Sequence, residues 1–151
     1  MGVTIDSITT IPSGSRLYID TNVWIYALEG FSGYVNSLQK LFSRIDTGEL
    51  RAITSELTLA ETLVKPMSQR NDTLAKTYIE ALQTGEFLTL VPVSREILIE
   101  AARLRATHPS LKLPDAVHAA SAISSQATFF ISNDARLARL SAFQTIALEM
   151  A

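Results

Sequence analysis

The sequence predicts an α/β fold in which helices cover a central parallel sheet, and two features of the chain predict it. Short apolar runs bounded by turn residues alternate with longer stretches whose apolar residues recur at helical spacing. This alternation is typical of strands joined by crossover helices, which makes the strands parallel. The 151 residues are 47% hydrophobic and contain no repeat, linker or low-complexity tract, so residues 1–151 are predicted to form one domain with one core.

The expected elements follow one another in an alternating order along the chain. The strands are expected at residues 16–19, 51–54, 87–91, 128–131 and 145–148. The helices are expected around residues 23–29, 35–45, 57–64, 74–82, 97–104, 114–125 and 135–140. Pro66 is predicted to end the third helix, because proline lacks an amide hydrogen, and Pro114 is predicted to open the sixth. Residues 1–15 are polar, contain Pro12 and Gly14, and are expected to form a leader or edge segment.

Charge and composition exclude several functional classes. Thirteen basic and 15 acidic residues give a net charge of −2, which argues against a general nucleic-acid coating protein that neutralises many phosphates. The lack of cysteine excludes disulfides, thiol catalysis and cysteine-ligated zinc. No apolar run approaches the ~18 residues that span a membrane, and the start of the sequence does not have the pattern of a signal peptide. We therefore expect a soluble, cytoplasmic protein without a membrane partner.

Four acidic residues stand where a metal-dependent nuclease needs carboxylates. Asp20 directly follows the first predicted strand, and Asp134 lies three residues beyond the fourth. Glu61 lies on the helix after the second strand, and Asp115 lies in the first turn of its helix. Ligands of open α/β sheets bind outside the carboxyl ends of the strands, where the strand order reverses, so the four side chains are expected to form one acidic cup. Mg²⁺ or Mn²⁺ would relieve the repulsion between them, and metal sites of this kind commonly cut phosphodiesters.

Each of the four acids also has a structural explanation of its own. Asp20 and Asp134 are residues that often begin helices, and Asp115 is a favourable partner for the helix dipole. Glu61 is also an ordinary exposed helix residue. Because all four fall at one predicted edge of the sheet, the metal-site interpretation is favoured over four separate structural roles.

Four motifs surround these acids and cover most of the chain. They are Tyr18-Ile19-Asp20-Thr21-Asn22-Val23, Leu59-Ala60-Glu61, Leu111-Lys112-Leu113-Pro114-Asp115-Ala116-Val117-His118-Ala119-Ala120 and Ile131-Ser132-Asn133-Asp134. With these motifs, residues 16–148 resemble the PIN-domain family and, more narrowly, the VapC-type toxins of toxin–antitoxin pairs. The last motif begins with Ser132 where many members have threonine, and a hydroxyl group is retained.

The resemblance implies a fold, an activity and partners. The implied fold is a three-layer α/β/α sandwich whose parallel sheet of about five strands has the order 3-2-1-4-5. The implied activity is cleavage of RNA by a water activated on Mg²⁺ or Mn²⁺, and the implied partners are a cognate antitoxin protein and a second copy in a homodimer. The implied metal ligands and catalytic residues are Asp20, Glu61, Asp115 and Asp134. The supporting candidates, which would position water or phosphate, are Thr21, Asn22 and Ser132.

Several further residues are open to two interpretations. His118 lies three positions after Asp115 on the same helix face and is either a base or, with the stronger case, a packed or exposed histidine. Trp24, Tyr26 and Phe31 are either a platform for RNA bases or, with the stronger case, part of the core or of a partner groove. The basic residues that would either rim the site or lie on solvated helix faces are Arg103, Arg105, Lys112, Arg136 and Arg139.

Two rival functions stay open at this point. A DNA-directed, structure-specific nuclease would use the same metal chemistry, but the small chain carries no added helical arch or basic clamp that would favour it. A non-catalytic PIN-like binding or regulatory module would keep the fold without the reaction. The four intact acidic positions argue against that module.

Overall fold

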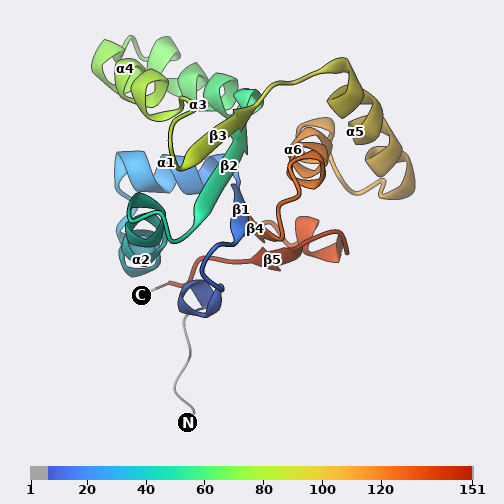
Figure 1. Cartoon of the computed structure of the whole chain (residues 1–151). Coiled ribbons are helices and arrows are strands. Elements are labelled where there is room, and N and C mark those ends of the chain that lie inside the picture. Colours follow the sequence, from blue (N-terminus) through green and yellow to red (C-terminus); the bar gives the residue numbers. More distant parts are fainter. Residues whose placement is uncertain (1–6, 151) are drawn as a thin grey trace.

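The computed structural model describes residues 7–150 and has a five-stranded parallel sheet at its centre (Figure 1). The strands are Arg16–Ile19 (β1), Arg51–Ser55 (β2), Leu88–Val91 (β3), Phe129–Ile131 (β4) and Gln144–Ile146 (β5). Their order in the sheet is β3-β2-β1-β4-β5, and all four pairings are parallel. The expected α/β class and strand order are therefore confirmed. The order reverses between β1 and β4, which makes the carboxyl ends of these two strands the place where a ligand site is expected.

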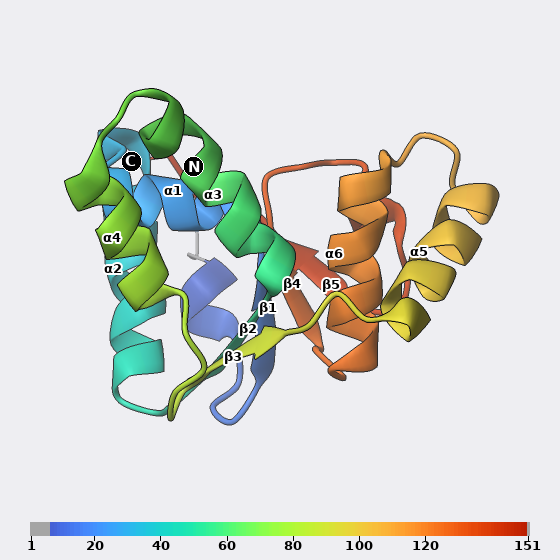
Figure 2. The same ribbon diagram turned by 90° about the horizontal axis from the view of Figure 1, so that it is seen from above.

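Helices lie on both sides of the sheet and give the fold three layers. They are Thr21–Glu29 (α1), Val35–Asp46 (α2), Glu56–Ser68 (α3), Asp72–Ala81 (α4), Arg95–Thr107 (α5) and Leu113–Ser124 (α6), with short 3-10 helices at Ser7–Thr10 (η1), Ser32–Tyr34 (η2) and Leu137–Arg139 (η3). Viewed from above, α5 and α6 lie on one side of the sheet and α1 to α4 on the other (Figure 2). Within residues 7–150, no helix combines the length and the apolar character that crossing a membrane requires.

Two expected helices differ from those in the structure. Pro66 does not end α3 but lies inside it, and the helix continues to Ser68. Proline removes only its own amide donor there, and the following turn is retained because Gln69 N donates to Lys65 O at 3.0 Å. The helix expected at residues 135–140 is only the 3-10 turn η3, Leu137–Arg139. Its start is shaped by the Asp134 carboxylate, which accepts a hydrogen bond from the backbone N–H of Arg136 at 2.9 Å.

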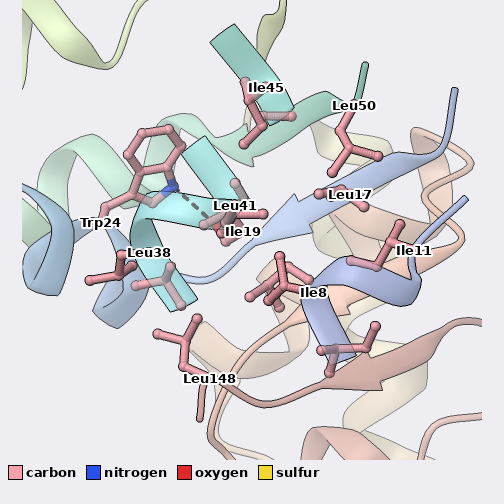
Figure 3. Packing of buried hydrophobic residues seen from close by; sticks show 14 of the residues in the cluster. Ile8, Ile11, Leu17, Ile19, Trp24, Leu38, Leu41, Ile45, Leu50 and Leu148 are labelled. Atoms are coloured by element: carbon pink, nitrogen blue, oxygen red, sulfur yellow. Dashed lines mark hydrogen bonds between the residues drawn. The ribbon is translucent and has the colours of Figure 1, made fainter. Parts of the chain in front are cut away.

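The alternation of side chains along β1 divides the core between the two faces of the sheet. Leu17 and Ile19 point into the apolar cluster under α1 and α2 (Figure 3), whereas Tyr18 points to the opposite face, where α6 packs. Trp24 is buried in the first cluster and donates its indole N–H to Ile19 O at 3.3 Å. Trp24 is therefore a core residue. Because side chains alternate along a strand, Asp20, two residues after Tyr18, lies on the same face of the sheet as Tyr18. This face therefore carries the candidate site.

The segment before β1 belongs to the core. Ile8 and Ile11 are 0% and 2% exposed and pack in the cluster of Leu17 and Ile19. The guanidinium of Arg44 on α2 donates to Ile8 O at 2.8 Å and to Ile11 O at 2.6 Å, which fixes the segment to the helix. Of the expected leader 1–15, residues 1–6 lie outside the described residues, and the remainder packs against the domain.

Candidate active site

The carboxyl ends of β1 and β4 carry the centre of the candidate site. The backbone N–H of Asp20 donates to Ile131 O at 3.1 Å, so the pairing of the two strands continues up to Asp20. Ser132 follows β4 directly, and its hydroxyl donates to Asp20 Oδ2 at 2.8 Å. The same hydroxyl accepts the backbone N–H of Asp134 at 3.0 Å. The hydroxyl of Ser132 therefore ties the first acid to the loop that carries the last one.

Asp20 is half-buried and also begins α1. Its Oδ1 accepts the backbone N–H of Thr21 at 2.9 Å, so the structural role considered for Asp20 coexists with its place in the site. Burial raises the pKa of the Asp20 carboxyl above its ordinary value, although His118 and the hydrogen bonds from Ser132 and Thr21 oppose the shift. A carboxylate in this position is costly to keep charged, and a bound cation would offset that cost.

Glu61 projects from α3 into a network of buried donors. Its Oε1 lies 2.6 Å from His118 Nε2 and accepts the hydroxyl of Thr21 at 2.8 Å. Burial alone raises the pKa of Glu61, but the contacts with His118 and Thr21 outweigh it, so the pKa lies below its ordinary value. Glu61 is therefore held as a carboxylate on the side of the site that faces α6.

Asp134 and Asp115 form the other side of the site, and Arg136 lies between them. Arg136 Nη2 is 2.7 Å from Asp134 Oδ2 and 3.4 Å from Asp115 Oδ2. The Arg136 guanidinium holds the pKa of the Asp134 carboxyl below its ordinary value, against the smaller opposing effect of partial burial. Asp115 also accepts the backbone N–H of Lys112 at 3.2 Å at the start of α6, as a residue in a first helical turn commonly does.

The four acids are thus linked in a row rather than gathered in one cup. Within residues 7–150, no three acidic or histidine side chains stand close enough together to hold a metal ion. Metal binding by these four acids stays a prediction. Like charges stay apart unless a cation separates them, and the guanidinium of Arg136 supplies that cation at the Asp115 and Asp134 side.

The chemistry of the donors nevertheless suits a hard divalent cation. All four candidates are carboxylates, the ligands that Mg²⁺ and Mn²⁺ prefer. A polar cavity of about 380 Å³ opens beside two of them, Asp20 and Asp134, and its lining also includes Asn22, Ser132 and Arg136. Asp115 and Asp134 would become available to a metal once Arg136 withdraws. The residues therefore fit the oxygen-donor chemistry of a divalent cation.

The supporting candidates occupy different positions. Thr21 and Ser132 are buried, and each donates to one of the acids. Asn22 is exposed in the polar cavity, and its side chain makes no hydrogen bond within the described part of the chain. Asn22 therefore faces whatever enters the cavity, whereas Thr21 and Ser132 orient the acids.

Sequence reasoning missed part of this network. The interpretation of His118 as a packed residue agrees with its 2% exposure, but its hydrogen bond to Glu61 was not anticipated. Tyr18, whose hydroxyl lies 2.6 Å from His118 Nδ1, was treated only as a strand residue. Parity along β1, which places Tyr18 and Asp20 on one face, was the available signal. Arg136 was named as one of several rim residues, and no pattern singled it out from the others.

Comparisons with known proteins agree with this architecture. The family model described as "PIN domain" matches residues 17–142. No curated relative matches the chain by sequence. Among solved structures, VapBC2 from Rickettsia felis, bound to a DNA fragment from its promoter, is 16% identical with a TM-score of 0.67, and the match covers 89% of this chain and 99% of that one.

Two further solved structures give similar values. DNA-bound VapBC from Salmonella typhimurium is 16% identical with a TM-score of 0.65, covering 89% of this chain and 98% of that one. The sarcin-ricin loop cleaving toxin VapC20 from Mycobacterium tuberculosis is 15% identical with a TM-score of 0.61, covering 81% and 92%. Identities this low show a common fold only. The family match, which spans most of the chain, confirms the expected resemblance: this protein belongs to the PIN-domain family.

Proposed function

We propose that this protein is a metal-dependent endoribonuclease and the toxin of a type II toxin–antitoxin pair. The observation that carries the proposal is the row of four carboxylates at the strand-order reversal of a PIN domain. An arrangement that leaves several charged oxygens around a polar cavity favours a divalent cation and a phosphate substrate over an apolar ligand. The proposed metal is Mg²⁺ or Mn²⁺, and its proposed ligands are Asp20, Glu61, Asp115 and Asp134.

The chain's own residues would divide the work of the reaction. When bound, the cation lowers the pKa of its water and neutralises charge on the phosphate oxygens. Ser132 and Thr21 hold Asp20 through its two carboxylate oxygens, which keeps that carboxylate in one orientation. Arg136 is the cation that contacts the acids, and once released from them it is able to pair with a phosphate of the RNA. Asn22 lines the same cavity and offers a neutral donor and acceptor.

An apolar groove supports the proposed antitoxin partner. A cavity of about 460 Å³ lies between α1, α2 and the end of α4, and Tyr26, Phe31, Leu38 and Phe42 are among its lining residues. The rings of Tyr26, Phe31 and Tyr34 pack against one another with centroids 5.1 Å apart. Exposed apolar grooves of this kind accept an amphipathic partner segment. One solved structure of the same fold, from Klebsiella pneumoniae, is a toxin–antitoxin complex, which supports an antitoxin as that partner. We propose a homodimer as well, and light scattering measures it directly.

One observation favours a second candidate, a non-catalytic binding module. Arg136 pairs with two of the four acids, Asp115 and Asp134. A protein that never binds a metal would keep these two ion pairs. The two candidates differ in what they predict for RNA, and a single experiment separates them.

The experiment is cleavage of a mixed RNA pool by the purified protein, with Mg²⁺ or Mn²⁺ against chelator, and with single-stranded DNA of matched length in parallel. We expect cleavage of RNA that requires the metal and is lost in Asp20→Asn. The control is Asp46→Asn, an exposed acid at the end of α2, which should cut like the unmodified protein. Cleavage that persists in Asp20→Asn would contradict the assignment, and cleavage of DNA alone would replace RNA as the substrate. No cutting combined with no metal binding in calorimetry would favour the binding module.

A further inference from the structure

Behind Glu61 lies a buried chain of hydrogen bonds that the proposed reaction does not use. The side chain of His118 on α6 is 3% exposed, and both of its ring nitrogens have partners. Nδ1 lies 2.6 Å from the hydroxyl of Tyr18, which is 0% exposed, and Nε2 lies 2.6 Å from Glu61 Oε1. The chain therefore connects the centre of β1 with the surface of the site through one imidazole ring.

The position of one proton in this chain follows from its geometry. A carboxylate accepts hydrogen bonds and has none to donate. If Nε2 carried no hydrogen, it would face Glu61 Oε1 at 2.6 Å as a second acceptor, which is a repulsive contact. Nε2 therefore carries a hydrogen and donates it to Glu61. The hydroxyl of Tyr18 is placed to hold the other nitrogen and so fixes the plane of the ring.

The two oxygens of Glu61 are left in different conditions. Oε1 accepts from both His118 and Thr21. Within residues 7–150, no donor or cation contacts Oε2. Oε1 is thus fixed by two hydrogen bonds, and Oε2 is available to a ligand.

We propose that Tyr18 and His118 are positioning residues that lock the Glu61 carboxylate by its Oε1 and so present Oε2 to a divalent cation. The inference rests on the proposed function, because the cation is the one assigned to the site above. Partners behind a metal-binding side chain orient it, and their loss typically weakens metal binding or activity by about 10–100-fold. His118 need not contact the metal or the substrate for this role.

The burial of Tyr18 suits it to the role. Its side chain is 0% exposed, so water does not compete with His118 for the hydroxyl. Tyr18 also stacks on Phe130, with ring centroids 4.9 Å apart, so its ring is held from the side as well.

The first arm of the test is the proton on His118, observed by ¹H–¹⁵N NMR of protein with labelled histidine. The sequence has two histidines, so His108→Gln leaves only the His118 signals. We expect a hydrogen with a one-bond coupling to Nε2 that exchanges slowly with solvent, in the protein without added metal. A hydrogen on Nδ1 alone would overturn the proposal. This arm is independent of metal binding and of cleavage.

The second arm is the affinity for Mn²⁺, measured by calorimetry on variants that retain or remove the donor. His118→Leu should weaken Mn²⁺ binding by about 10-fold or more. His118→Gln, whose amide N–H replaces Nε2–H, should restore most of that loss. Tyr18→Phe keeps the ring packing, removes the hydroxyl, and should fall between the two. Circular dichroism identifies any variant that does not fold, and the Tyr18→Phe comparison stands even if His118→Leu fails.

The outcomes separate the positioning role from the proposed function. Equal Mn²⁺ affinity in folded His118→Leu, Tyr18→Phe and the unmodified protein would overturn the positioning role. An equal loss in His118→Gln and His118→Leu would overturn it too. In that case the amide N–H of glutamine would not replace the N–H of His118, and the role of His118 would be structural only. If the unmodified protein binds no Mn²⁺, the proposed function fails, and the NMR arm alone then decides whether His118 holds Glu61.

Discussion

The two sides of the acidic row hold their carboxylates in opposite ways. On one side, Glu61 accepts hydrogen bonds from His118 and Thr21, and the His118 side chain is only 3% exposed. On the other side, Asp134 and Asp115 share the guanidinium of Arg136, whose side chain is 37% exposed. Asp20 lies between them. Its pKa is raised because the carboxyl is buried and no cationic side chain is bonded to it.

The comparison shows two ways to stabilise a carboxylate: hydrogen bonds fix the orientation of Glu61, whereas an ion pair with Arg136 neutralises Asp134 and Asp115. A buried donor orients one oxygen of a carboxylate, and in Glu61 it leaves Oε2 without a donor or cation in contact within residues 7–150. A full cation cancels charge over a larger region, but an exposed ion pair of this kind is weak and is screened by salt. Under the proposed metal mechanism, Arg136 is therefore the group that a cation would displace.

Removing one charge from each side should give the largest effect and the clearest contrast. Under the proposed metal mechanism, Glu61→Gln should lower metal-dependent cleavage by at least about 100-fold, the upper range reported for partners behind a ligand. Asp134→Asn should lower it by only about 10-fold, because Arg136 already offsets the charge of Asp134. Initial rates on one RNA at saturating Mn²⁺ measure both. Equal losses in the two variants would show that the two sides contribute alike.

Arg136 itself should act as a competitor of the metal. Arg136→Gln removes the cation that pairs with Asp115 and Asp134, so Mn²⁺ should bind about 2–5-fold more tightly, the range expected for loss of an exposed ion pair. The matched control is Arg139→Gln, an exposed arginine on the neighbouring 3-10 turn. Calorimetry at low salt measures the affinity, and the advantage of Arg136→Gln should shrink as salt rises. Unchanged affinity would remove Arg136 from the metal site.

Stability should respond in opposite directions at Asp20 and Glu61, with the smallest effect of the three. The pKa of Asp20 is raised on folding, so its contribution is favourable at low pH and is lost as pH rises through the folded pKa. The pKa of Glu61 is lowered, so its contribution is present at neutral pH and is lost as pH falls through the folded pKa. At neutral pH and with chelator, Asp20→Asn should raise the Tm and Glu61→Gln should lower it, each by about 2–4 °C.

The pH dependence of these Tm differences checks the signs. Both differences should shrink in acid, because the unmodified carboxyls are then protonated and resemble the amides. The Asp20 difference should begin to shrink at the higher pH, because its pKa is raised and that of Glu61 is lowered. Differential scanning calorimetry over a pH series measures this. Two shifts of the same sign at neutral pH would contradict the contrast between the two carboxylates.

The sequence predicted the fold better than the state of the site, for a physical reason. Strand β1 and the start of α6 are determined by local patterns, a short apolar run and a proline in a first helical turn. The position of the acids follows from strand order. Pro66 was misread because a proline in a last turn costs only one hydrogen bond, and Pro66 itself belongs to the buried face of α3 with Thr58 and Thr62.

The contacts among the site residues are not local and could not be predicted in the same way. The bond from His118 to Glu61 joins two helices 57 residues apart in sequence. The bridge from Arg136 to Asp115 depends on which of several equivalent arginines the fold brings to the acids. Side-chain partners of this kind are selected by tertiary geometry, which composition and periodicity do not encode.

The segment that contains Ile8 and Ile11, whose carbonyl groups accept hydrogen bonds from Arg44, affects where the domain boundary should be drawn. The family match begins at residue 17, after both Ile8 and Ile11. A recombinant chain cut at that boundary would uncover the cluster that these isoleucines fill and would leave Arg44 without two of its carbonyl acceptors. Fully burying an isoleucine contributes about 1.5–3 kcal/mol, and a domain as a whole is stable by only about 5–15 kcal/mol. A shortened version would therefore aggregate or unfold for reasons unrelated to the acids.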